Sequence, residues 1–125
     1  MKEQCTIQLS HKTQTQIELI ARLLAQLAQS GDIIFLKGDL GVGKTVFARA
    51  FIQELTSPLI TVPSPTFTIL QTYETIKGPL WHLDLYRISN PDEVAELGFP
   101  PHESVISLVE WPEHLPQHLP SHPLI

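Results

Sequence analysis

Cysteine and long apolar runs are scarce in this sequence of 125 residues. The single cysteine, Cys5, permits no intramolecular disulfide and no metal site made of several thiolates, which is typical of a reducing compartment. The longest run of aliphatic or aromatic residues, Ile33 to Leu36, is far shorter than the ~20 residues that span a bilayer. Residues 1–12 contain no apolar segment typical of a secretory signal. We therefore expect a cytoplasmic protein that does not enter a membrane.

Basic residues are also few, and they are unevenly placed. The chain has 8 Lys and Arg against 13 Asp and Glu, a net charge of −5, so it lacks the positive charge needed to hold a phosphate backbone unaided. Direct nucleic-acid binding is therefore disfavoured. No basic residue follows Arg87, whereas six acidic residues do: Asp92, Glu93, Glu96, Glu103, Glu110 and Glu113. This acidic third is either a solvated surface that favours solubility or a docking surface for a basic partner.

Proline is absent from residues 1–57, and all 11 prolines follow. Apolar spacing in the first part predicts strands at 5–9 and 33–37 and helices at 14–28 and 46–55. Thr13 with Gln16 forms a capping box at the start of the first helix, and Gly31 is expected to end it. Loops dominate the second part of the chain, because proline is excluded from helix interiors. We predict strands at 67–73, 80–86 and 105–109, and a turn at Gly78-Pro79 between the first two. A short helix is predicted from Asn90 to Leu97. One domain fits this length.

Residues 112–125 predict an extended tail rich in proline and histidine. His114, His118 and His122 recur every four residues, which suggests a metal site. Proline excludes the helix that would align them, and in polyproline II the imidazoles point in different directions. We therefore disfavour a metal site in the tail.

The strongest signal is a phosphate-binding loop between a predicted strand and a predicted helix. Gly38-Asp39-Leu40-Gly41-Val42-Gly43-Lys44-Thr45 matches G-x-x-x-x-G-K-[ST] at every fixed position. The glycines let the backbone N–H groups wrap phosphate oxygens at a helix N-terminus. Lys44 is expected to reach the β- and γ-phosphates, and the Thr45 hydroxyl to coordinate Mg²⁺. The sequence thus predicts ATP or ADP with Mg²⁺ as cofactors.

Two carboxylates are candidates for the metal and for the attacking water. Asp84 and Glu110 each stand at the carboxyl end of a predicted strand, the edge where open α/β sheets bind ligands. The sequence does not decide between them. Ser64 and Thr66 lie between prolines in Pro63-Ser64-Pro65-Thr66-Phe67, where NTPases carry a switch segment, so Thr66 is a candidate sensor of the γ-phosphate. Arg87 falls on the strand face opposite Asp84, which disfavours a role as an arginine finger.

Five segments together resemble one family. GDLGVGKT, PSPTF, HLDLYR, a short acidic helix ending in ELGF, and LVEWPE follow in the order and spacing of the TsaE (YjeE) family, bacterial P-loop ATPases required for threonylcarbamoylation of adenosine 37 in tRNAs that read ANN codons. The resemblance implies that Lys44 and Thr45 bind nucleotide and Mg²⁺ and that Asp84 and Glu110 are the functional acidic pair. It also implies that Ser64 to Thr66 form the switch, and it places Thr13 near the adenine, although capping explains Thr13 equally well.

The resemblance further implies partners and a fold. Family members act on a complex of TsaB and TsaD, which holds the tRNA, and do not transfer the carbamoyl group themselves. The implied fold is an α/β, P-loop NTPase-like three-layer sandwich with a mixed, mostly parallel sheet. Relatives continue into further strands after the position of Ile125, so the last strands of that sheet can be missing here. Val42 and Val46 replace the usual Ala and Thr, which we expect to weaken nucleotide affinity.

Two other function classes remain open from the sequence. A small-molecule P-loop kinase shares the loop but needs an arginine-rich lid, and only Arg49, Lys77 and Arg87 follow Lys44. A non-catalytic module, in which bound nucleotide only orders a docking surface, is the second. A GTPase is disfavoured because the N-K-x-D guanine motif is absent.

Overall fold

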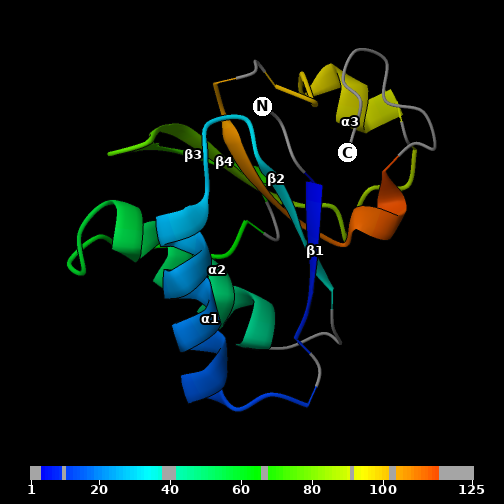
Figure 1. Ribbon diagram of the computed structural model, residues 1–125. Coiled ribbons are helices and arrows are strands. Elements are labelled where there is room, and N and C mark those ends of the chain that lie inside the picture. Colours follow the sequence, from blue (N-terminus) through cyan, green and yellow to red (C-terminus); the bar gives the residue numbers. More distant parts are fainter. Residues whose placement is uncertain are drawn as a thin grey trace.

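The structure, a computed structural model, describes residues 4–9, 11–37, 42–65, 68–90, 92–101 and 104–115. Its elements follow in the order β1 (Gln4–Gln8), α1 (Gln14–Leu27), β2 (Ile33–Lys37), α2 (Val42–Leu55), β3 (Leu70–Thr75), β4 (Gly78–Asp84), α3 (Asp92–Glu96), β5 (Ile106–Glu110) and the 3₁₀ helix η1 (Pro112–His114) (Figure 1).

The five strands form one sheet in the order β1-β2-β5-β4-β3. Strands β1, β2, β5 and β4 run parallel to one another, and β3 pairs antiparallel with β4 through a hairpin. The last strand among the described residues, β5, therefore lies between β2 and β4. This mixed, mostly parallel sheet confirms the predicted fold class.

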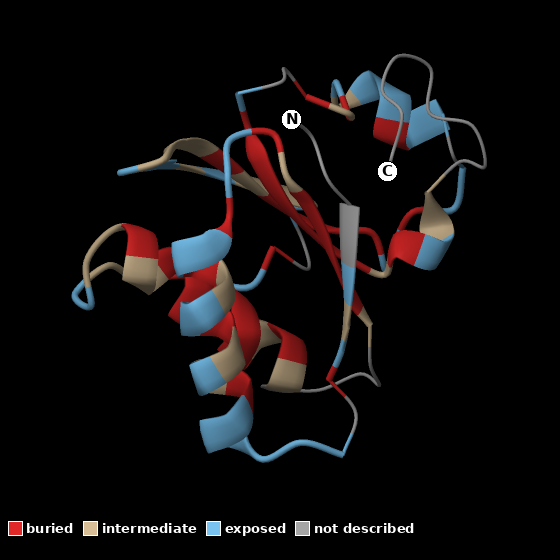
Figure 2. Ribbon diagram, viewed as in Figure 1, coloured by how far each residue is buried: buried red, intermediate tan, exposed pale blue. Residues whose placement is uncertain are grey.

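Helices and loops cover both faces of the sheet, which gives three layers (Figure 1). On one face, α1 and α2 pack with inward side chains of the central strands, among them Leu36, Leu80 and Leu108. On the other face, Phe35 and Val109 belong to a second apolar cluster formed with α3 and the loops around it. Figure 2 shows the central strands as the most buried part of the molecule, because each is covered by a layer on both sides.

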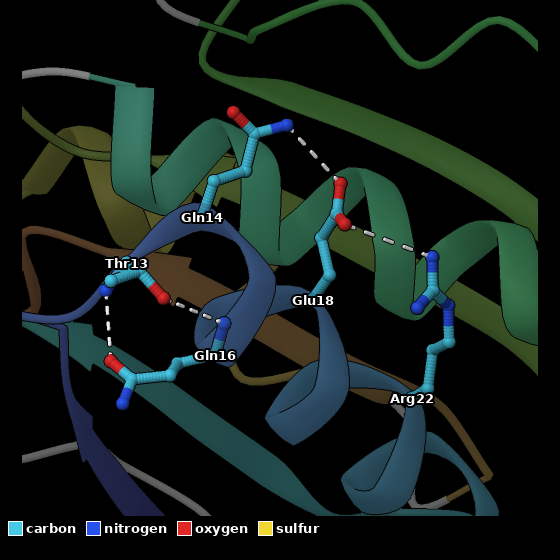
Figure 3. A network of polar contacts seen from close by, with 5 residues as sticks. All are labelled: Thr13, Gln14, Gln16, Glu18 and Arg22. Carbon is cyan, nitrogen blue, oxygen red and sulfur yellow. Dashed lines mark hydrogen bonds and ion pairs between the residues drawn. The ribbon is translucent and has the colours of Figure 1, made fainter.

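Helix α1 begins at the predicted capping box. The Thr13 hydroxyl accepts a hydrogen bond from the Gln16 N–H (3.1 Å), and the Thr13 N–H donates to Gln16 Oε1 (2.9 Å) (Figure 3). On the next turn, Glu18 accepts from Gln14 Nε2 (3.3 Å) and lies 4.0 Å from Arg22 Nη2. The two contacts between Thr13 and Gln16 satisfy backbone N–H groups that otherwise lack partners at the start of a helix.

The other end of α1 is closed by a residue distant in sequence. Lys77, in the turn between β3 and β4, donates from its Nζ to the carbonyl oxygens of Ala25 (2.8 Å), Gln26 (2.7 Å) and Ala28 (2.6 Å). An ammonium at a helix C-terminus also interacts favourably with the helix dipole. Helix α1 ends at Leu27, earlier than the glycine stop suggested. Gly31 (φ 93°) instead forms the turn before β2.

Several predicted boundaries were wrong. The hairpin turn consists of Ile76 and Lys77, and Gly78 and Pro79 already belong to β4. Strand β3 begins only at Leu70, and β4 ends at Asp84, so Tyr86 is not in the strand that we predicted to contain it. The tail is not extended from residue 112, because Pro112–His114 form η1, and residues 116–125 lie outside the described residues. Among the described residues, no helix has the length and apolar character of a membrane span.

Candidate nucleotide site

The candidate site lies where three parallel strands end side by side. Strand β2 ends at Lys37, directly before the phosphate-binding motif, and its Leu36 is the register partner of Glu110 on β5. Glu110 in turn is the register partner of Asp84 on β4. The carboxyl ends of β2, β5 and β4 therefore form one edge, the position at which open α/β sheets bind ligands.

The two candidate carboxylates meet at this edge. Register partners on parallel strands project on the same face of the sheet, and Asp84 and Glu110 share the face of Leu80, Leu108 and the P-loop helix. Both are buried, with 5% and 4% of their surfaces exposed. Asp84 Oδ1 accepts a hydrogen bond from the Tyr86 N–H (3.0 Å), which fixes this short side chain at the end of β4. The structure thus brings the two candidate carboxylates together at one edge of the sheet; their roles remain a prediction.

Glu110 has a histidine partner that sequence reasoning did not assign to the site. His82 Nε2 lies 2.7 Å from Glu110 Oε2, and the imidazole is 1% exposed. His82 stands two residues before Asp84 on β4, so period-2 alternation puts both on one face. That alternation was visible in the sequence, but the contact depends on β5 lying next to β4, which no local pattern indicates.

Lys44 of the phosphate-binding motif reaches the same edge. It lies in the first turns of α2 and is buried (3% exposed), and its Nζ stands 3.8 Å from the ring centroid of Trp111. A lysine ammonium at this distance from an indole ring forms a cation–π contact. Trp111 follows Glu110 directly, with left-handed backbone angles (φ 58°, ψ 53°), and its ring lies 5.0 Å from that of Tyr86. The motif lysine and the end of β5 are therefore in contact.

The remaining predicted nucleotide ligands are only partly described. Gly38, Asp39, Leu40 and Gly41 lie outside the described residues, as does the side chain of Val42. Gly43 and Thr45 belong to the first turns of α2; a Cβ added at Gly43 would stand 3.4 Å from Ile17 Cδ1 of α1. The start of α1 thus packs against the end of the motif. Thr13 acts as the α1 N-cap, and its contact with nucleotide stays a prediction.

Backbone hydrogen bonds connect the end of the predicted switch segment to Asp84. Thr66 lies outside the described residues, and Ser64 is exposed. Farther on, the Ile69 N–H donates to the Pro65 carbonyl (2.7 Å), and the Ile69 carbonyl accepts from the Asp84 N–H (2.8 Å). Ile69 has φ 69°, a rare conformation for a β-branched residue that is characteristic of strained functional segments. The backbone therefore links the end of the switch segment to the end of β4.

Arg87 and the histidines of the tail are the other residues that the sequence analysis singled out. Arg87 is exposed in the turn after β4. His114 Nδ1 lies 2.6 Å from the Leu85 carbonyl, to which it donates, whereas His118 and His122 fall outside the described residues. In the parts of the chain that are described, no three His, Cys, Asp or Glu residues group as metal ligands.

The donor set at the edge fits Mg²⁺ with nucleotide phosphates. Mg²⁺ prefers oxygen ligands and is usually bound by one or two carboxylates together with substrate phosphates and water. Asp84 and Glu110 supply two neighbouring buried carboxylates, and Thr45 supplies a hydroxyl in the turn that carries Lys44. These three side chains of the described residues are too few to hold the ion alone, so its occupancy should depend on bound phosphate.

Comparison with known proteins identifies the family. A family model described as "Threonylcarbamoyl adenosine biosynthesis protein TsaE" matches residues 11–124. Three curated proteins named tRNA threonylcarbamoyladenosine biosynthesis protein TsaE illustrate the similarity. The Rickettsia felis protein is 44% identical over 110 residues, the Rickettsia prowazekii protein 43% over 109, and the Bacillus subtilis protein 41% over 107.

These matches cover most of this chain and a smaller share of the relatives. They include 85%, 84% and 84% of the chain, and 62%, 73% and 66% of the Rickettsia felis, Rickettsia prowazekii and Bacillus subtilis proteins, respectively. The chain thus spans about two thirds of the length of these relatives. The matched region contains the phosphate-binding motif and both carboxylates, and on this evidence the chain belongs to the TsaE family.

Proposed function

We propose that this chain binds ATP with Mg²⁺ at the edge formed by β2, β5 and β4 and hydrolyses it. The observation that carries this proposal is the meeting of Lys44, Asp84 and Glu110 at the carboxyl ends of parallel strands, with both carboxylates buried and adjacent in register. A lysine and two acids at this edge, next to a G-x-x-x-x-G-K-T motif, are suited to phosphoryl transfer to water.

Each side chain has a role that follows from its chemistry. The Lys44 ammonium binds the β- and γ-phosphate oxygens and neutralises part of their charge. The Thr45 hydroxyl and one carboxylate hold the ion, and the other carboxylate orients the attacking water by accepting a hydrogen bond from it. Bound Mg²⁺ supplies additional neutralisation of the charge that develops on the phosphate oxygens. Thr66 is proposed to respond to the γ-phosphate through the segment that connects it to Asp84.

We propose further that this hydrolysis serves threonylcarbamoylation of tRNA adenosine 37 through a complex of TsaB and TsaD. Membership of the TsaE family supports the pathway. The acidic composition supports an indirect role with respect to tRNA, because the chain lacks excess positive charge. Four of the six acids after Arg87 are exposed: Asp92, Glu93, Glu96 and Glu113. They are the candidates for contact with a basic partner, whereas Glu110 is buried in the site.

The decisive experiment measures ATP turnover by the purified chain alone and with the TsaB–TsaD complex. We expect slow hydrolysis alone and a strong increase with the complex, because an arginine supplied in trans raises rates by ~10³ to 10⁵ in other P-loop enzymes. Rapid hydrolysis by the chain alone would indicate an independent ATPase, and stimulation by a small-molecule acceptor would indicate a kinase. Nucleotide binding without turnover under every condition would indicate a non-catalytic module.

Charge reversal on α3 tests the docking surface. Glu93 is a poor choice alone, because its Oε2 accepts from the Ser89 N–H (3.3 Å) and thereby stabilises the start of α3. Glu96 is exposed, and no hydrogen bond of its side chain is found among the described residues. We expect Glu96→Lys to weaken stimulation by the complex and to leave ADP affinity unchanged, with Glu74→Lys, at an exposed position of β3, as the control. Equal stimulation of Glu96→Lys and the control would exclude this part of α3 from the docking surface.

A further inference from the structure

We propose that His82 is a positioning residue that holds the Glu110 carboxylate in one orientation, with Oε2 engaged and Oε1 left for the phosphate site. This inference rests on the proposed function and assigns a task to a residue outside the acidic pair. The observation behind it is the 2.7 Å contact between His82 Nε2 and Glu110 Oε2 in a buried environment.

The two carboxylates of the site differ in how they are held. Asp84 has a short side chain, and its Oδ1 is fixed by the backbone N–H of Tyr86. Glu110 has one more methylene group and one more torsion angle, and the hydrogen bond described for its side chain is the one from His82. Without a donor at Oε2, the Glu110 carboxylate has several rotamers available, and a catalytic group needs to be held within a fraction of an ångström of its working position.

His82 is well placed to provide that restraint. It lies in the interior of β4, between Gln71 of β3 and Leu108 of β5 in register, so its backbone is fixed on both sides. Its side chain has only two torsion angles and is almost completely buried. A carboxylate oxygen accepts, so Nε2 must carry the proton in this pair.

Stability alone does not explain this pair. Among the described residues, His82 Nδ1 is buried without a hydrogen-bond partner, which costs free energy. Replacing a buried polar pair of this kind by apolar residues of similar volume is often neutral or stabilising. Leu80, two residues before His82 on β4, and Leu108, its register partner on β5, are apolar. The chain thus keeps a buried polar pair beside apolar residues, at the edge that carries the candidate site.

The test combines kinetics with a double-mutant cycle, measured with the stimulating complex present. We expect His82→Leu to lower kcat about 10- to 100-fold, the usual effect of removing a group that orients a functional side chain of a metal site, and to change KM for ATP little. His82→Gln retains an N–H near the Nε2 position and should recover most of kcat. In a Glu110→Gln background, His82→Leu should have almost no further effect, because its action passes through Glu110. Ser107→Ala, a buried hydroxyl on the opposite face of β5, is the matched control.

A second measurement does not depend on turnover or on the folding of a variant. Long-range ¹H–¹⁵N NMR spectra of the wild-type chain, labelled at histidine, should show a proton on Nε2 of the His82 ring. The Nε2 resonance should move in Glu110→Gln. A ring protonated only at Nδ1 would overturn the inference.

The outcomes separate the two proposals. Normal turnover in both the wild type and His82→Leu would overturn the role of His82 and leave the ATPase proposal intact. Equal losses in His82→Leu with and without Glu110→Gln would also overturn it, because His82 would then act independently of Glu110. Absence of turnover in the wild type with the complex would overturn the ATPase proposal, and the positioning role with it.

Discussion

Removing the Lys77 ammonium should destabilise the fold without touching the candidate site. Its Nζ donates to three carbonyl oxygens at the end of α1, at 2.6 to 2.8 Å, and these are groups that a helix cannot satisfy internally. An ammonium has three protons, so all of its donors are used. The same turn is tied to the residues after α1, because the Ser30 hydroxyl donates to the Lys77 carbonyl (3.2 Å).

The size of the effect follows from these contacts. A hydrogen bond to a charged group contributes about 1.5 to 3 kcal/mol, and a cation at a helix C-terminus about 0.3 to 1 kcal/mol. Ordering a lysine side chain costs up to about 2 kcal/mol, and water can reach the Gln26 carbonyl once the ammonium is gone. For Lys77→Met we therefore expect a loss of roughly 2 kcal/mol of unfolding free energy, which lowers Tm by about 8 °C for a chain of this length.

Urea unfolding, monitored by circular dichroism, measures this loss. Lys12→Met is the control, because Lys12 precedes α1 and its side chain is exposed. The slope m should be unchanged, since the same surface becomes exposed on unfolding. Lys77→Arg should retain part of the stability. If Lys77→Met unfolds at the same urea concentration as Lys12→Met, the ammonium does not stabilise the end of α1, and the reasoning is refuted.

Three further predictions concern Tyr73 and the site. Burial raises the pKa of Tyr73, and its hydroxyl is buried without a partner among the described residues, so Tyr73→Phe should increase the unfolding free energy by about 1 kcal/mol at neutral pH. Tyr73 ionises at a lower pH in the unfolded chain than in the folded one, so the wild type should lose stability as the pH rises above 10.0. Urea unfolding of Tyr73→Phe should show a smaller loss of stability at alkaline pH. Lys44→Ala and Thr45→Ala should abolish binding or turnover of Mg-nucleotide while the circular dichroism spectrum stays native; unchanged affinity and hydrolysis in both would exclude the P-loop site. In Trp81→Phe, the fluorescence of Trp111 should change on addition of ADP and Mg²⁺, because its ring lies 3.8 Å from Lys44 Nζ. Constant fluorescence up to saturating ADP would indicate that the end of β5 does not lie at the nucleotide site.

Local patterns predicted the elements that depend on local chemistry. The capping box of Thr13 and Gln16 and the apolar periodicity of α2 are encoded within a few residues, and both are found. The ends of β4 and β5 were predicted well enough to place Asp84 and Glu110 at the same edge. Errors occurred where a Gly-Pro pair resembled a turn, because the hairpin is closed by Ile76 and Lys77 and tolerates Pro79 within β4.

Contacts between distant segments could not be predicted in this way. The pairing of His82 with Glu110 requires β5 to lie beside β4, and the contact of Lys44 with Trp111 requires it to lie beside β2. No spacing along the chain specifies the strand order, which is decided by the fit of whole layers around the sheet. The contact of Lys77 with the end of α1 likewise requires the hairpin to lie next to α1, which no local pattern indicates.

The central position of β5 also has a consequence for the order of folding. Strands β2 and β4 do not pair with each other, and each borders β5, so residues 4–37 and 70–84 can form only two separate pieces of sheet until residues 106–110 are inserted between them. These pairings close long loops, such as that between Ile33 and Ser107, and are expected to form slowly. During synthesis, before residues 106–110 have left the ribosome, the edges of β2 and β4 that later pair with β5 are exposed. Unpaired strand edges of this kind are the sites at which chaperones or aggregation would act.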